Sequence, residues 1–372
     1  MTTIRLDHPA AGIVTLRPGG APTALDAVPA LDTLVLEVTG GHLTWSLLAG
    51  QQLPAATLDD TESAQDWLWA VYGENIALAV ADDEGHHREL TATPARPELV
   101  TALRRLAYAH WASRWWPAST VDNIPALDQA ALAKEIDELS AVCESVVAGA
   151  DDPDAAAVAI DSPMNETSDP PRGQANEGSP PNEPSASRLG GDRIPADGQA
   201  VVPRRAEDYA LAAGGEAGGT GLALARGTGD WDWRSCPPGL VDAGARAVSW
   251  QVRRGGGVTT VEVTAIAAPD CPRDVPAHLL PLARLRTGDS LAEIPLARRA
   301  DAWVGELRTT EVIESLASVA VCVPGVGPEH PLPEESATRA SIREFVRHRL
   351  DAARANDLLA AELAAAEDDS DF

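Results

Sequence analysis

The stretch from residue 149 to residue 198 most constrains how this chain can fold. It contains no aromatic residue and few aliphatic ones, and it is rich in Pro, Gly, Asn, Ser and Asp. A segment of this composition cannot bury enough apolar surface to offset the conformational entropy that folding removes. We therefore predict a disordered linker over residues 150–203, with a folded domain on either side of it.

The residues before this linker predict a small α+β domain over 1–149, because short strands come first and helices follow. Apolar and polar residues alternate on both sides of Gly40-Gly41, which predicts a hairpin over 33–48. The other elements that we expect are strands at 3–9 and 12–18, a helix at 59–73, a second hairpin over 75–94 that turns at 83–85, and helices at 97–116 and 125–148.

The residues after the linker predict a mainly-β domain over 204–330, either a sandwich or a barrel-like fold. The clearest hairpin covers 247–267 and turns at Gly255 to Gly257. Proline and glycine recur between further short apolar segments, a spacing typical of such folds. These segments are 221–226, 280–286, 291–297, 302–308 and 319–325. A C-terminal helix with an acidic tail is expected over 331–372.

The charge of the chain excludes one large class of partners. The formal net charge is −27, and no segment is basic. Binding to nucleic acid or to an anionic membrane needs clustered Lys and Arg that release counterions. We therefore expect protein partners of unknown identity and no nucleic acid. All but one of the 29 basic residues are Arg, a bias that indicates a GC-rich bacterial source.

Targeting and metal-binding patterns are also missing from the sequence. The first residues lack the apolar run of a signal peptide, and no stretch approaches the ~20 apolar residues that cross a bilayer. The four cysteines lie far apart and form no CxxC motif, so neither a zinc ribbon nor a redox site is predicted. We expect a cytoplasmic protein with reduced thiols, no membrane insertion and no cofactor.

A cluster of aromatic residues, YAHWASRWWPAS at 108–119, suggests an interaction site. Trp111 and Trp115 continue the inward-facing stripe of the helix at 97–116, to which the spacing also assigns His110. Trp116 lies about 100° further round the helix, just before a proline that ends it. Trp and Arg are favoured anchors at protein interfaces, so Arg114 and Trp116 are predicted interaction residues.

A second aromatic cluster, GTGDWDWRSCPPG, covers residues 227–239. Asp230 and Asp232 form a DxD pair, a weak candidate for holding a metal ion. If the segment is a strand, the two aspartates share one face and Trp231 and Trp233 share the other. The two indoles then either pack half-buried or form a surface on which a sugar stacks.

No established catalytic pattern is present, and no residue is assigned as catalytic. The chain lacks a GxSxG elbow, a P-loop, an HExxH motif and a kinase signature. The sequence favours a non-catalytic cytoplasmic adaptor or accessory protein that mediates protein–protein interaction. One alternative is a carbohydrate- or small-ligand-binding module that uses the Trp231/Trp233 surface. The other is an enzyme whose site is assembled from residues distant in sequence.

Overall fold

The computed structural model describes residues 2–22, 29–82, 86–147, 221–229, 231–288, 290–327, 335–351 and 358–368. The predicted linker and Asp230 lie outside the described residues. Residues 1–151 and 219–372 belong to one compact unit. The division of the chain at residues 149, 203 and 330 into separately folding parts stays a prediction.

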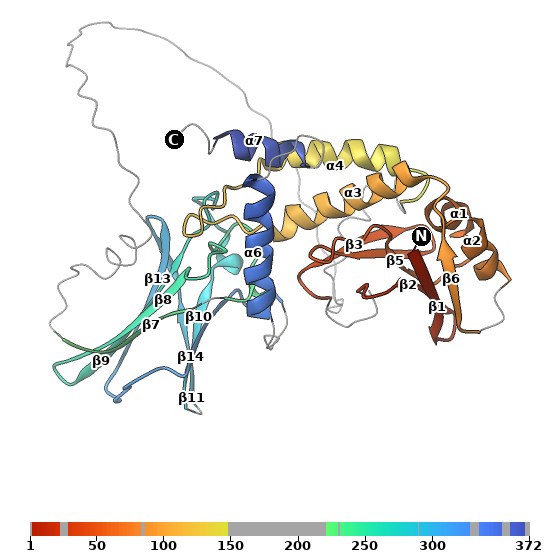
Figure 1. Ribbon diagram of the computed structural model, residues 1–372. Helices are drawn as coiled ribbons and strands as arrows, with labels where there is room; N and C mark the ends of the chain where they lie inside the picture. Colours follow the sequence, from red (N-terminus) through yellow and green to blue (C-terminus); the bar gives the residue numbers. More distant parts are fainter. Residues whose placement is uncertain are drawn as a thin grey trace, which may run out of the picture. The chain divides into compact units, whose positions relative to one another are not determined.

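The first part of the chain has the predicted α+β organisation and contains one antiparallel sheet in the order β3-β4-β5-β2-β1-β6 (Figure 1). The predicted hairpin at Gly40-Gly41 is confirmed, and Gly40 adopts φ +77°. A Cβ at Gly40 would lie 2.3 Å from the carbonyl oxygen of Asp60, so the turn requires glycine. The strands are β1 (Thr2–Ala10), β2 (Ile13–Pro18), β3 (Thr33–Val38), β4 (Gly41–Ser46), β5 (Ala55–Leu58) and β6 (Arg88–Ala92).

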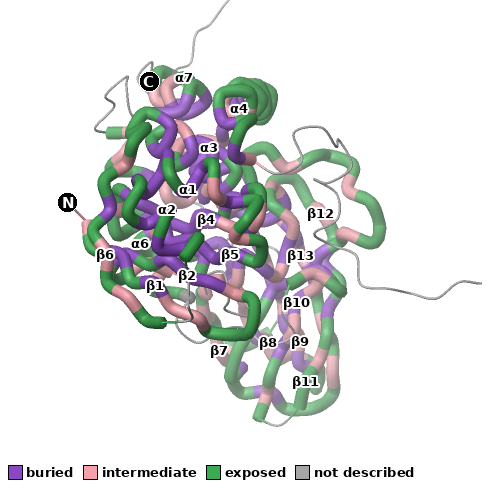
Figure 2. Tube along the Cα trace, turned by 90° about the vertical axis from the view of Figure 1, so that its right-hand side faces the viewer, coloured by how far each residue is buried: buried purple, intermediate pink, exposed green. Residues whose placement is uncertain are grey.

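The helices of the first part of the chain bury side chains in the same hydrophobic core as this sheet. They are α1 (Gln65–Tyr72), α2 (Glu74–Ala81), α3 (Pro97–Trp115) and α4 (Gln129–Cys143). Alternate strand residues such as Ile4, Leu6 and Leu16 are fully buried, and the buried positions of the sheet and helices appear in purple in Figure 2. The strand residues between them, such as Arg5 and Arg17, are exposed, so one face of the sheet carries the polar side chains.

The predicted second hairpin, over 75–94, is wrong in its first half. Residues 74–81 form α2, and β6 pairs with β1 instead. Ile76 and Val80 are buried one helical turn apart, and the alanines between them favour a helix. Gly73, with φ +92°, allows the chain to turn between α1 and α2. The expected turn at 83–85 lies outside the described residues.

The second part is mainly β, as predicted, and its described strands form two antiparallel sheets that do not close into a barrel. The larger sheet has the order β12-β13-β9-β8-β7 and the smaller one β11-β10-β14. Gly305 brings the sheets together, since a Cβ there would lie 2.7 Å from the side chains of Ile294 and Leu296. The strands are β7 (Leu222–Gly229), β8 (Val248–Gly255), β9 (Val258–Ile266), β10 (Leu282–Thr287), β11 (Ser290–Pro295), β12 (Ala297–Arg299), β13 (Ala302–Thr309) and β14 (Ser318–Cys322).

The helical C-terminal region is confirmed, but it contains two helices, α6 (Glu335–Asp351) and α7 (Ala360–Asp368). The backbone N–H of Leu359 donates to the carboxylate of Glu362 at 2.7 Å. A glutamate three residues into a helix that bonds back to the capping residue is a helix-start signal. Glu362 therefore defines a new helix N-terminus within the segment that the apolar spacing predicted as one helix.

Candidate functional site

The predicted interaction residues Arg114 and Trp116 lie at the end of α3. Arg114 is exposed, and its guanidinium carbon lies 4.9 Å from the ring centroid of Trp115. Trp116 is half-buried, and its indole N–H donates to the carbonyl oxygen of Pro125 at 2.8 Å. The loop that follows α3 thus covers part of this indole, and whether Arg114 and Trp116 bind a partner stays a prediction.

The inward stripe of α3 is confirmed at Trp111. Trp111 is buried, stacks on Tyr108 with ring centroids 5.8 Å apart, and donates its indole N–H to the carbonyl oxygen of Leu31 at 2.8 Å. His110, which the spacing assigned to the same stripe, is exposed. The spacing places His110 about 40° from the buried Leu106 on the same stripe, so its exposure reflects how the described segments cover this turn of α3, which helical spacing alone does not determine.

The second aromatic cluster is buried. Trp231 and Trp233 are each 5% exposed, and the Trp231 indole N–H donates to the carbonyl oxygen of Asp242 at 2.7 Å. The guanidinium carbon of Arg343 lies 5.7 Å from the ring centroid of Trp233. The two indoles do not lie on a strand, because β7 ends at Gly229 and Trp233–Ser235 forms a 3₁₀ turn. These indoles present almost no ring face to solvent, so their burial gives the sugar-stacking alternative no support.

Of the two aspartates in the DxD pair, the structure describes Asp232, and this residue caps a 3₁₀ turn. The side chain of Asp232 accepts a hydrogen bond from the backbone N–H of Arg234 at 3.0 Å and so caps the 3₁₀ turn. Asp230 lies outside the described residues. No group of three or more His, Cys, Asp or Glu side chains suited to a metal ion occurs in the described part of the chain.

A buried carboxylate connects the loop after α3 to the β-rich part. Asp242 is fully buried and accepts hydrogen bonds from Ser119 Oγ and from the backbone N–H groups of Thr120 and Gly244, each at 2.7 Å. Arg343 of α6 approaches Asp122 in the same loop at 3.3 Å. A buried charge with several donors is stable, and removing one partner would leave it uncompensated.

A second buried network connects α3 and α4 to the C-terminal helices. The carboxylate of Glu362 accepts two hydrogen bonds from Arg349, at 2.9 and 2.7 Å, and one from the Tyr108 hydroxyl at 2.6 Å. Burial, together with the neighbouring Glu362 carboxylate, raises the pKa of Tyr108 well above its usual range. Glu135 pairs with Arg105 and accepts from the backbone N–H of Ala360 at 2.7 Å. Both carboxylates accept hydrogen bonds from side chains and backbone groups that join the helices to one another. We therefore interpret the role of this network as holding the helices together.

The thiols of Cys143 and Cys236 are buried and lack the low pKa of a reactive nucleophile. Burial raises the pKa of the Cys143 thiol to about 11 and raises that of Cys236 further. Both side chains are therefore protonated near neutral pH, and the thiolate is the nucleophilic form. All four cysteines are free thiols.

One exposed aromatic residue was not singled out by the sequence analysis. Trp69 on α1 is 50% exposed; the structure describes all ten tryptophans, and each of the other nine is buried or half-buried. Leu78 on α2, the next helix, is 54% exposed. Asp66, Glu74 and Asp82 are exposed on or beside the same two helices. We call these five residues the α1–α2 surface. The signal in the sequence was the spacing of Trp67 and Trp69, which a helix separates by about 200°.

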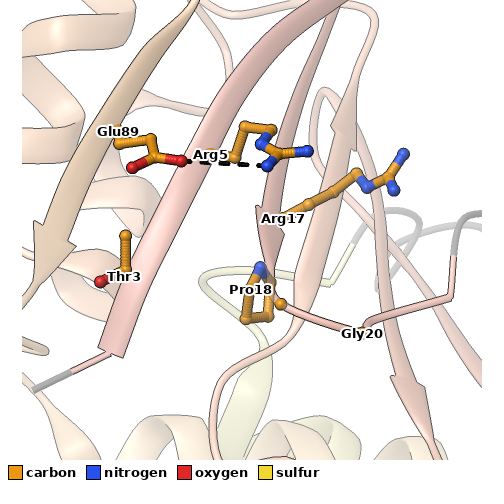
Figure 3. Close-up of a pocket in the computed structure, with 7 residues that line it drawn as sticks. Thr3, Arg5, Arg17, Pro18, Gly20 and Glu89 are labelled. Atoms are coloured by element: carbon orange, nitrogen blue, oxygen red, sulfur yellow. Dashed lines mark ion pairs between the residues drawn. The ribbon is translucent and has the colours of Figure 1, made fainter.

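A small cavity opens on the polar face of the N-terminal sheet. It has a volume of about 280 Å³ and is lined by Thr3, Arg5, Arg17, Glu89 and the Gly19-Gly20 turn (Figure 3). We call it the arginine pocket. Arg5 approaches Glu89 at 3.8 Å, whereas Arg17 has no ion-pair partner among the described residues.

Comparisons of this chain with known protein families, with curated proteins and with solved structures found no match. In the described part of the chain, no helix has the length and apolar character needed to cross a membrane. The features of the described residues that bear on function are the α1–α2 surface, the buried networks and the arginine pocket.

Proposed function

We propose that this chain is a non-catalytic adaptor or accessory protein that binds another protein through the α1–α2 surface. The observation that carries the proposal is the exposure of Trp69, a residue type that dominates the binding energy of protein interfaces. Leu78 adds a second exposed apolar side chain on the neighbouring helix. We propose that these two side chains, carried by helices that pack against each other, form the apolar centre that a docking surface needs.

The charges around Trp69 indicate the chemistry of the partner. The exposed acids Asp66, Glu74 and Asp82 accompany the two apolar residues, and the whole chain is strongly acidic. Complementary charges accelerate association and reject partners of like charge. The partner that fits is a protein with an apolar pocket for the indole and Lys or Arg side chains at the rim.

The proposed cellular site is the cytoplasm. Support comes from the four free cysteines, because disulfides form in oxidising compartments and are rare in the cytosol. The residues Arg114 and Trp116 remain candidates for a second contact, since Arg114 is exposed and Trp116 is half-buried.

The test is affinity capture with the full chain and with matched surface variants. We would capture partners from the source cell with the unaltered chain, then measure the purified partner against Trp69→Ala, Leu78→Ala and the double variant. Leu291→Ala is the control, because Leu291 is 60% exposed and lies on β11, outside the α1–α2 surface.

We expect the double variant to weaken binding by at least roughly tenfold, the effect of losing about 1.4 kcal/mol at an interface anchor. The control should bind as the unaltered chain does. The proposal fails if the α1–α2 variants keep full affinity, or if Leu291→Ala loses as much.

Nucleic acid is not among the partners that we propose. The net charge of −27 would repel a polyanion, and no basic segment is present to displace the counterions condensed on nucleic acid. We predict no measurable binding of DNA or RNA at physiological salt. A gel shift by the full chain that weakens steeply with added salt would contradict this prediction.

A further inference from the structure

The pairing of the strands places three charged side chains in one row on the polar face of the sheet. Arg5 on β1 lies directly opposite Arg17 on β2 and directly opposite Glu89 on β6. Side chains opposite one another on neighbouring strands share a face, with Cβ atoms about 4.5–5.5 Å apart. Figure 3 shows Arg5 between Glu89 and Arg17.

A β-bulge establishes this arrangement. Ala10 pairs with Ile13 next to the turn, but the register shifts between Asp7 and Ala10, so that Arg5 faces Arg17. Without the shift, Arg5 would face Pro18 and Arg17 would lie on the face of the buried Leu6. Bulges often redirect a side chain beside a functional site, and this one places Arg17 on the same face as Arg5.

Among the described residues, the positive charge of this row exceeds the negative charge. Arg5 is paired with Glu89, while Arg17 is exposed and has no ion-pair partner among the described residues. Like charges directly opposite each other on neighbouring strands destabilise a sheet. An anion bound between the two guanidinium groups would remove this repulsion.

We propose that the arginine pocket binds the phosphate group of a small phosphate monoester. A phosphate monoester carries a charge of about −1.5 to −2 and three acceptor oxygens, which suit two guanidinium forks. Glu89 orients Arg5 and is free to accept a hydrogen bond from a hydroxyl or amine on the same ligand. The Gly19-Gly20 turn leaves room for the ligand, because a Cβ at either residue would meet no atom within 4 Å.

The size and the charge of the surroundings limit the ligand. The cavity of about 280 Å³ is smaller than the roughly 300–1,000 Å³ typical of sites for drug-sized molecules. Charges farther apart than a Debye length of about 8 Å are screened from each other, so the rest of this acidic chain repels a small bound ligand little, whereas a long polyanion places further charges close to the chain. A phosphate with a few attached carbon atoms fits, and a nucleic acid strand does not.

The test is a ³¹P NMR titration of the full chain with three probes: inorganic phosphate, free phosphoserine, and phosphoserine within a short uncharged peptide. We expect a Kd on the order of 1 mM for inorganic phosphate. Tighter binding of free phosphoserine would identify a small molecule as the source of the phosphate. Tighter binding of the peptide than of free phosphoserine would overturn the assignment to a small molecule and would indicate a phosphorylated protein segment instead.

Variants distinguish specific phosphate binding in the arginine pocket from non-specific electrostatic attraction to any arginine. Arg17→Gln should weaken phosphate binding at least tenfold, and Arg17→Lys should be intermediate, because lysine keeps the charge but lacks the fork. Arg226→Gln changes the charge equally at an exposed position of β7 and should have no effect. Binding should also weaken from pH 7.5 to pH 5, since the phosphate dianion takes up a proton near pH 6.

A thermal melt without ligand tests whether Arg5 and Arg17 repel each other in the unoccupied pocket. Arg17→Gln should raise the melting temperature by about 1–2 °C, because it removes the repulsion from Arg5. The proposal is overturned if Arg17→Gln binds phosphate as well as the unaltered chain does, or if chloride at equal ionic strength displaces phosphate equally well. A lower melting temperature for Arg17→Gln would also overturn it, by making Arg17 a structural residue.

Discussion

The helix α1 and the end of α3 each carry one buried tryptophan and one that points away from the core. The two outward-pointing indoles differ in how far solvent reaches them. On α1, Trp67 is buried and donates its indole N–H to the carbonyl oxygen of Thr39, whereas Trp69 is exposed. On α3, Trp111 is buried, but Trp116 just past its end is only half-buried, because the loop that ends at Pro125 lies against it. Helical spacing identifies which indole leaves the core, but the path of later segments decides whether solvent reaches it.

The largest expected effect is on the two buried indoles. Trp67→Ala and Trp111→Ala should each lower the free energy of unfolding by about 3–5 kcal/mol, because each leaves a large cavity and a carbonyl without its donor. Urea unfolding followed by circular dichroism measures the change. A loss below about 1 kcal/mol at either position would show that the indole is not a core anchor. It would contradict the distinction between buried and outward-pointing tryptophans.

The intermediate case is Trp116. Trp116→Ala should cost about 1–2 kcal/mol, because a half-buried ring and one hydrogen bond to Pro125 are lost. The same urea series applies, with Trp116→Phe to separate the ring from the indole N–H. A cost equal to that of Trp111→Ala would mean that Trp116 belongs to the core.

The smallest expected effect is at Trp69. Trp69→Ala should change the free energy of unfolding by no more than about 0.5 kcal/mol, because an exposed position away from special features tolerates replacement. The variant should also lose the component of tryptophan fluorescence that acrylamide quenches most readily. Large destabilisation with unchanged quenching would place this indole inside the protein and would remove the basis of the proposed interface.

The sequence predicted most of the strands and helices, because their signals are local. Gly40 and Gly256 mark turns between alternating segments, and both have positive φ. Residues 74–81 were harder, since their apolar side chains fit both a strand and a short helix. The split of the C-terminal helices was missed because Glu362 acts there as a capping residue.

The candidate sites were less predictable, because they depend on contacts between distant segments. The arginine pocket requires β6 to pair with β1 and a bulge to set the register with β2, and neither is visible in the local sequence. The burial of Trp231 and Trp233 depends on Asp242 and on Arg343 of α6. Trp69 was predictable, since a residue two positions from a buried tryptophan on a helix must point elsewhere.

The contacts of α7 have a consequence for the order in which the protein is completed during synthesis. Ala360 follows its partner Glu135 by 225 residues, and Glu362 follows its partner Tyr108 by 254 residues. At about 5–20 residues per second, the ribosome needs on the order of 10–50 s to travel from α4 to α7. During that interval Glu135 can pair with Arg105 alone, so the nascent chain offers a helical face that any competing amphipathic helix could occupy first.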